Sequence, residues 1–154
     1  MVTRFDPTRR TMLGGALAAL GLATVVPRAA RAAARLGFEE LYGKIGVLGL
    51  SFSDKTKALA GQEVAMQGFM APPLKAEAAF FVLTEIPMSI CPFCSSDADW
   101  PANIVVVYLG RKQTFEQANR MIDVSGRLEV GSWTDPETGF VSLLRIVDAS
   151  FASV

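Results

Sequence analysis

Ile104-Val105-Val106-Val107-Tyr108-Leu109 is the stretch of this 154-residue chain that decides its fold. Its residues are β-branched, aromatic or Leu, which is the composition of a strand, and the run is too short for a buried helix. The run Ala79-Phe80-Phe81-Val82-Leu83-Thr84 is likewise expected to be a strand, and it is too continuously apolar to have a fully exposed face. We therefore expect a β-sheet protein.

Other segments share the short, apolar, turn-bounded pattern of strands. They are Ile45 to Phe52, Gln62 to Met70, Ala79 to Thr84, Val124 to Val130 and Val141 to Val147. In the second of them, strand alternation places Val64, Met66 and Gly68 on one face. The last two segments are joined through Asp135-Pro136 and Gly139, which are turn residues, so we expect a hairpin there.

Helix is expected only in short pieces, at Phe38 to Tyr42 and Phe115 to Met121. Five or six short strands with so little helix predict an all-β fold with minor α content, arranged as a small OB-like barrel of five to six strands. The alternation of strand and helix that builds a parallel sheet is absent from the sequence.

The first 34 residues have the order of an export signal. Arg9-Arg10 precedes an uncharged run from Met12 to Pro27, and Ala30-Arg31-Ala32-Ala33-Ala34 offers small residues at A-x-A spacing. This order is typical of a twin-arginine signal peptide. We expect the twin-arginine translocase to export the chain, cleavage near residues 32–34, and one periplasmic domain over residues 35–154. The apolar run is too short and too rich in Gly and Ala for a stable membrane span.

The charge of the chain changes when the signal is set aside. Five of the fifteen basic residues but only one of the fifteen acidic residues lie before residue 33, which leaves ten bases, fourteen acids and a formal net charge of −4. The remaining charges are dispersed along the sequence. Nucleic-acid binding relies on clustered Lys and Arg, so we expect no nucleic-acid partner.

Cys91-Pro92-Phe93-Cys94 holds the only two cysteines, in a chain without histidine. Outside the cytoplasm such a pair is expected to form a structural disulfide, which stabilises little because its loop is short. A second interpretation is a metal site, in which Cys91, Cys94, Asp97 and Asp99 would offer thiolates and carboxylates to zinc, or the thiolates alone to copper. A third is thiol–disulfide exchange by Cys91 and Cys94, although Pro101 leaves little room for the helix that activates such thiols.

The absence of histidine argues against most catalytic chemistry. A Ser-His-Asp arrangement is impossible, and the commonest general base and metal ligand is missing. We therefore expect no catalytic residue and a non-enzymatic binding or accessory protein, with the segment Met88 to Pro101 contacting an envelope protein or small ligand. The alternative is an oxidoreductase that uses Cys91 and Cys94, or a Zn- or Cu-binding envelope protein. Trp100 and Trp133 would either flank a binding surface or cover an end of the barrel.

The order of several short motifs resembles an uncharacterised family of bacterial exported proteins, a domain of unknown function. The motifs are Gly61-x-x-Val64-x-x-x-Gly68-Phe69-Met70-x-Pro72, Phe81-Val82-Leu83-Thr84, Cys91-Pro92-x-Cys94, Asn103-Ile104-Val105-Val106-Val107 and Val124-x-Gly126-x-Leu128-x-Val130. The resemblance covers Leu59 to Val147 and implies an OB-like β-barrel that accompanies transport or metal-handling components of the envelope. The family often has histidine or extra proline after the first cysteine. This chain has no histidine, so a histidine-dependent metal site does not carry over.

Overall fold

Six strands of one sheet form the framework of the computed structural model, which describes residues 32–43, 50–72, 79–88 and 100–154. These residues belong to one compact unit, Arg31–Val154. The strands are β1 (Ala34–Arg35), β2 (Glu63–Met70), β3 (Phe80–Thr84), β4 (Ile104–Leu109), β5 (Met121–Thr134) and β6 (Val141–Ser153). The 3-10 turn η1 (Phe38–Glu40) and the helix α1 (Asp54–Leu59) lie between β1 and β2 in the chain.

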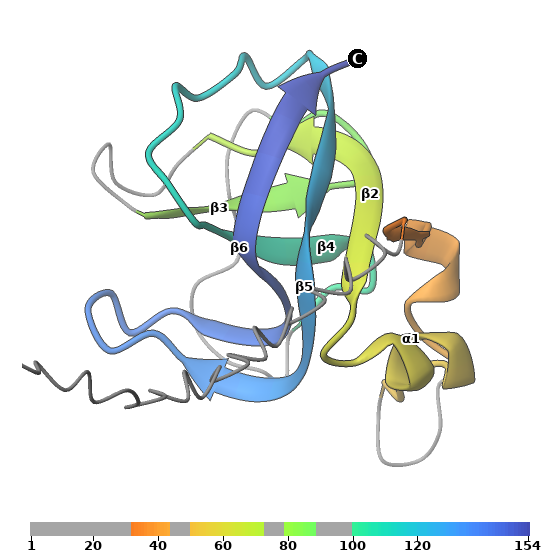
Figure 1. Ribbon diagram of the computed structural model, residues 1–154. Helices are drawn as coiled ribbons and strands as arrows, with labels where there is room; N and C mark the ends of the chain where they lie inside the picture. The colour runs from red at the N-terminus through yellow and green to blue at the C-terminus, as the bar shows by residue number, and fades with distance from the viewer. Residues whose placement is uncertain (1–31, 44–49, 73–78, 89–99) are drawn as a thin grey trace, which may run out of the picture. The chain divides into compact units, whose positions relative to one another are not determined.

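Five of these strands form a closed ring. Their order is β2-β3-β4-β6-β5, and β5 pairs again with β2. Within the ring only β4 and β6 are parallel, and every other neighbouring pair is antiparallel. In Figure 1, β3 and β4 run at a steep angle to β5 and β6, as expected of a small, strongly coiled barrel. The predicted OB-like, mostly β barrel is confirmed.

Strand β2 pairs with three strands, because two of them share one of its edges. Residues Glu63–Phe69 pair with β5 along one edge. On the other edge β1 pairs with Val64 and Ala65, whereas β3 pairs only with Phe69 and Met70. The short strand β1 thus occupies the part of the β2 edge that β3 does not reach, so residues just after the predicted signal are part of the sheet.

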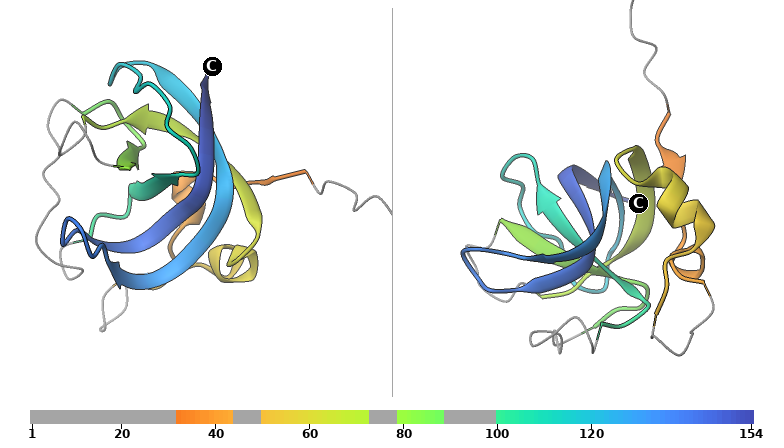
Figure 2. Two further views of the ribbon diagram at one scale, coloured as in Figure 1. Left: turned by 60° about the vertical axis from the view of Figure 1, so that its left-hand side comes forward. Right: turned by 90° about the horizontal axis from the view of Figure 1, so that it is seen from below.

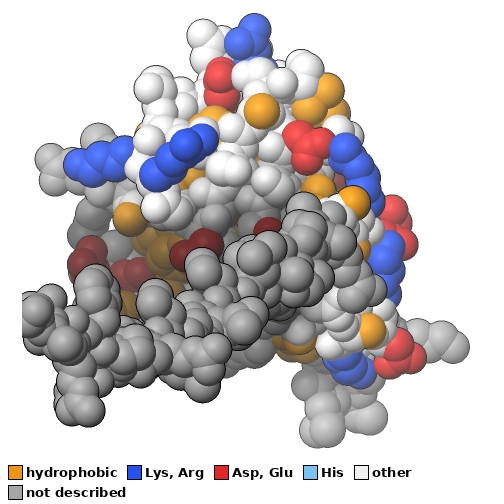
Figure 3. Space-filling view, viewed as in Figure 1, with side chains coloured by type: hydrophobic (Ala, Val, Ile, Leu, Met, Phe, Trp, Pro, Cys, Tyr) orange, Lys and Arg blue, Asp and Glu red, His pale blue; other side chains and the backbone are white. Residues whose placement is uncertain are grey.

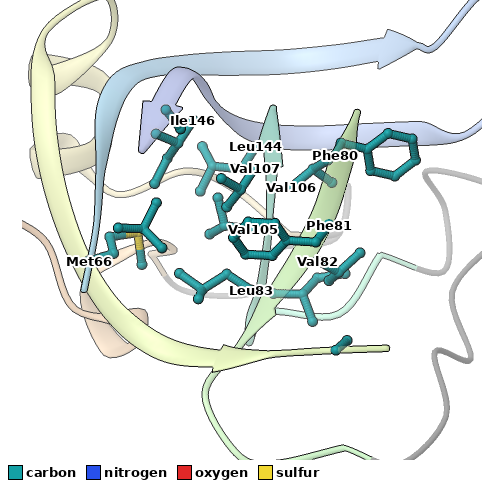
Figure 4. Close-up of a cluster of buried hydrophobic side chains, with 14 of the residues drawn as sticks. Met66, Phe80, Phe81, Val82, Leu83, Val105, Val106, Val107, Leu144 and Ile146 are labelled. Atoms are coloured by element: carbon teal, nitrogen blue, oxygen red, sulfur yellow. The ribbon is translucent and has the colours of Figure 1, made fainter. Parts of the chain in front are cut away.

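The core lies inside the ring and follows the expected alternation. Val64, Met66 and Met70 of β2 are buried while Glu63 and Gln67 are exposed. Figure 4 shows the central cluster, where Phe81 and Leu83 meet Val105 and Val107 while the Phe80 ring points away from them. All of β3 is buried, which confirms that neither of its faces is fully exposed, and the first four residues of β4 are buried as well. The strand bounds predicted for Ile104 to Leu109 are also confirmed.

Helix occurs where it was not predicted. The α1 helix begins after Ser53, whose Oγ accepts a hydrogen bond from the Thr56 amide at 3.0 Å and so caps the first turn. Thr56 is buried and its hydroxyl also donates to the Glu40 carbonyl, which ties α1 to η1. Figure 2 shows that α1 lies on the outside of the barrel.

The helix predicted at Phe115 to Met121 is wrong. Residues 112–117 are irregular, and Met121 already opens β5. Phe115 is partly buried and meets the Phe81 ring edge-on at 6.4 Å, so tertiary packing of this ring determines the local conformation. Of the predicted strand Ile45 to Phe52, residues 45–49 lie outside the described residues, and Phe52 forms an isolated bridge with Tyr42.

One residue interrupts the pairing of β6 with both of its neighbours. Asp148 is an extra residue in β6 relative to β4 and to β5, and its φ is 52°. Such a left-handed conformation at a bulge is tolerated by Asp better than by most residues. The Arg127 guanidinium contacts the Asp148 carboxylate at 3.0 Å. In the adjoining strand Gly126 has no room for a side chain, since an added Cβ would lie 2.7 Å from the Val147 carbonyl oxygen.

Candidate functional site

The cysteine motif and the metal ligands proposed with it lie outside the described residues. This applies to Cys91, Cys94, Asp97 and Asp99, and likewise to Arg9 and Arg10 of the export signal. The disulfide, metal and redox interpretations therefore stay predictions. Among the residues that are described, no group of three or more Cys, His, Asp or Glu side chains is placed to hold a metal ion.

Both ends of the segment that carries the cysteines are described, and they meet at the end of the β3–β4 hairpin. The Glu85 amide donates to the Asn103 carbonyl at 3.3 Å, one step beyond the paired residues Thr84 and Ile104. The buried Thr84 hydroxyl lies 3.1 Å from the Phe69 carbonyl oxygen and 2.7 Å from that of Ile86. We call these residues, together with Trp100 and its partner Tyr42, the loop base.

Trp100 joins the loop base to the N-terminal part of the domain. Its indole Nε1–H donates to the Tyr42 hydroxyl at 2.6 Å, across 58 positions of sequence, and the indole is 9% exposed. The Tyr42 ring stacks on Phe52 with ring centroids 5.4 Å apart. Burial raises the pKa of Tyr42 to about 12, an effect that the hydrogen bond from Trp100 partly offsets. Trp100 therefore covers an end of the core rather than an open surface.

A second group of polar and aromatic side chains lies on the hairpin arm, which we define as residues 129–145 of β5, β6 and their turn. Asp135 begins the turn and is buried. Its Oδ1 accepts hydrogen bonds from the Glu137 amide and from the Thr138 amide and hydroxyl, at 2.7 to 3.0 Å. Its Oδ2 accepts from the Tyr108 hydroxyl of β4 at 3.1 Å. The arm is thereby closed on itself and attached to the barrel.

The pKa values of the Asp135–Tyr108 pair reflect these bonds. Burial acts to raise the pKa of Asp135, but the hydrogen bonds from Thr138, Tyr108 and Glu137 outweigh it and lower that pKa. Burial and the neighbouring Asp135 carboxylate both raise the pKa of Tyr108. A carboxylate whose two oxygens accept four hydrogen bonds is held in its charged form, which suits a turn and not proton transfer.

Arg145 is the other charged residue buried in the arm, with 7% of its surface exposed. Its guanidinium donates to the Gly131 carbonyl at 2.9 Å, to the Ser142 carbonyl at 3.2 Å and to Glu129 at 3.4 Å. It also lies over the Trp133 ring, 5.2 Å from the ring centroid. Trp133 is 39% exposed and meets Tyr108 edge-on. Sequence reasoning singled out Trp133 but missed Arg145, because a lone Arg in an apolar strand reads as a solvent-facing residue.

The charged surface of the described residues consists mainly of short ion pairs. These join Arg35 with Asp123, Lys55 with Glu40, Lys57 with Asp54, Arg120 with Glu116, and Arg127 with both Glu129 and Asp148. Figure 3 shows acidic and basic side chains interspersed on the visible face. In the part of the chain that the structure describes, no helix is long and apolar enough to cross a membrane.

Comparison with known proteins supports the fold. No protein-family model matches the chain, and no curated protein matches it. Among solved structures it is similar to the crystal structure of a DUF3299 family protein from Pseudomonas aeruginosa PAO1, with a TM-score of 0.53 and 15% sequence identity. The likeness covers 80% of this chain and 97% of that one. At this identity the two proteins share a fold, and the likeness says nothing further of activity.

Proposed function

We propose that the chain is an exported, non-enzymatic binding or accessory protein of the bacterial periplasm. In this proposal the segment Met88 to Pro101, which we call the cysteine loop, contacts an envelope protein or a small ligand. The observation that carries the proposal is the loop base, where Glu85 bonds to Asn103 and Trp100 bonds to Tyr42. A loop whose two ends are fixed to a rigid sheet is a common way to present binding residues.

The surroundings of the loop base agree with a contact surface. Ile86, two residues before Met88, is a large apolar residue that is 58% exposed, so it is accessible to a partner that contacts the loop. By contrast, Asp135 and Arg145, which are the buried charged residues of the described barrel, are both engaged within the hairpin arm. The barrel thus offers a scaffold that holds both described ends of the cysteine loop.

This proposal has three forms, which differ in the chemical state of Cys91 and Cys94. A disulfide would fix the shape of the loop, and bound zinc or copper would do the same through metal ligation. A thiol–disulfide enzyme would instead need a first thiol with a pKa well below that of free cysteine. The structural disulfide is the form we propose, since the exported environment favours it and no helix-forming run follows Cys94 in the sequence.

A crosslinking experiment in the periplasm tests the binding role. A photoreactive residue is placed at Ile86, next to the loop, and in a matched control at Val154, which is 72% exposed at the C-terminal end. We expect a discrete crosslinked product from position 86 only, and its loss when Cys91→Ser and Cys94→Ser are introduced together. Equal products from both positions, or a product that survives the double substitution, would contradict the proposal.

The same purified protein distinguishes the three forms. Mass analysis with and without thiol alkylation should show both cysteines oxidised, elemental analysis should show no stoichiometric zinc or copper, and insulin reduction should be absent. Free thiols with one equivalent of metal would replace the disulfide by a metal site. Insulin reduction that disappears in the double Ser variant would replace the binding protein by an oxidoreductase.

A further inference from the structure

The residues at the predicted end of the export signal contain two overlapping cleavage sites. Signal peptidases require small residues at the first and third positions before the cleaved bond. Ala30 and Ala32 satisfy this requirement for cleavage between Ala32 and Ala33, whereas Ala32 and Ala34 satisfy it for cleavage between Ala34 and Arg35. The sequence between Arg28 and Arg35 contains no third such site, since every other register places Pro27, Arg28 or Arg31 at one of the two positions. Sequence alone does not choose between the two.

Only one of the two candidate peptide bonds lies within a strand of the sheet. The bond between Ala34 and Arg35 lies inside β1, where Ala34 is paired with Val64 and Arg35 with Ala65. The next residue, Leu36, donates its amide to the Ala65 carbonyl at 3.0 Å and its side chain is buried. The Arg35 guanidinium contacts Asp123 of β5 at 2.9 Å. Ala32 and Ala33 precede β1 and belong to no strand, and Ala32 is exposed.

We infer that processing takes place at the bond between Ala32 and Ala33, and that the mature chain begins with Ala33. A peptidase binds the residues around the bond in an extended form, so these residues must not be paired with the substrate's own sheet. Cleavage after Ala34 would require β1 to leave β2 first, and it would remove one of the two β1 residues. The twin-arginine route lets a chain fold before export, so β1 is already formed when the signal is removed.

The reaction is an ordinary hydrolysis that needs only a signal peptidase and water. Water adds across the amide, leaving a carboxylate on Ala32 of the released signal and an amino group on Ala33 of the mature domain. The retained residue Ala33 then precedes β1, so the charged amino terminus lies outside the strand. This inference rests on the export step of the proposed function and not on the cysteine loop, so either can fail without the other.

Two matched variants of the full chain, expressed in a host with the twin-arginine pathway, test it. Ala30→Arg removes the small residue needed for the first site alone, and Ala34→Val removes the one needed for the second site alone. Val suits the strand position that Ala34 occupies, so β1 is retained. We expect wild type and Ala34→Val to yield a periplasmic chain that begins at Ala33, whereas Ala30→Arg accumulates as the uncleaved precursor. Intact mass and N-terminal sequencing provide the readout.

Two outcomes would overturn the inference. A wild-type chain that begins at Arg35, or an Ala30→Arg chain that is processed there, would show that β1 does not protect the second bond while leaving export intact. A wild-type chain that retains Met1 would overturn the inference and the export step together. Neither outcome bears on the crosslinking from Ile86, which reports on the loop of the folded domain.

Discussion

The loop base and the hairpin arm use similar residues to different ends. Each involves a tyrosine whose hydroxyl is hydrogen-bonded and a tryptophan beside it: Trp133 meets Tyr108 edge-on, and Trp100 donates a hydrogen bond to Tyr42. In the arm, the partner of Tyr108 is Asp135, a charged residue whose remaining bonds all stay within one turn. At the loop base the partner of Tyr42 is Trp100, a neutral donor 58 positions away. Most hydrogen bonds of Asp135 join neighbours within one turn, whereas the loop base joins segments that lie far apart in the chain.

The largest effect should come from removing the charge at the centre of the arm. Arg145→Met keeps the apolar packing on Trp133 but leaves the carbonyl oxygens of Gly131 and Ser142 without their donor. We expect the free energy of unfolding to fall by about 2 to 3 kcal/mol in urea denaturation. The control is Arg127→Met, because Arg127 makes similar ion pairs at the surface and should contribute less than about 1 kcal/mol. Equal losses in the two variants would show that the arm has no buried network.

A smaller loss is expected at the loop base. Tyr42→Phe leaves the buried indole N–H of Trp100 without an acceptor, which should lower the free energy of unfolding by about 1 to 2 kcal/mol. Trp100→Phe should then cost less in the Tyr42→Phe background than in wild type, since the bond is already absent there. A double-mutant cycle by urea denaturation measures this coupling, which we expect to be about 1 kcal/mol. Strictly additive losses would contradict a direct bond between the two rings.

The smallest effect is a difference in titration between the two regions. Tyr42 and Tyr108 are the only tyrosines, and both have a raised pKa, that of Tyr42 being about 12. Because the folded values exceed the unfolded value of about 10, this contribution to stability is complete below pH 10 and is lost as the pH rises through the folded values. Ultraviolet difference spectra should show little phenolate at pH 10 while circular dichroism remains native. The first signal should then come from Tyr42 and disappear in Tyr42→Phe. Half of the phenolate signal at pH 10 in the native chain would refute the buried state of both rings.

The strands could be predicted because their signals are local. Composition identified Ile104 to Leu109, and the alternation around Val64 and Met66 identified the buried face of β2. The hairpin turn followed from Asp135 and Gly139, although β5 and β6 extend further than the apolar runs alone indicated. These features depend on neighbouring residues, which a sequence displays directly.

The contacts that define the candidate site are not local, and the sequence does not display them. Nothing near Trp100 points to Tyr42, and nothing near Arg145 points to the Gly131 carbonyl, because both contacts arise only when the ring of strands closes. The helix prediction at Phe115 failed for the same reason. It rested on local helix propensity, whereas the packing of Phe115 on Phe81 depends on the tertiary fold. β1 was missed because Ala34 and Arg35 carry no strand signal of their own and pair only because β3 leaves that edge of β2 open.

The bulge at Asp148 changes which residues of β6 count as interior. Before it the buried apolar side chains Leu144 and Ile146 fall on even positions, whereas after it the buried Ala149 and the partly buried Phe151 fall on odd ones. The Phe151 ring meets Phe81 edge-on at 5.5 Å. The hydrophobic pattern of β6 is therefore two patterns out of phase, and the single residue at 148 carries the phase shift. A chain shortened by that one residue would keep every apolar side chain of β6 and yet turn the Phe151 ring toward water.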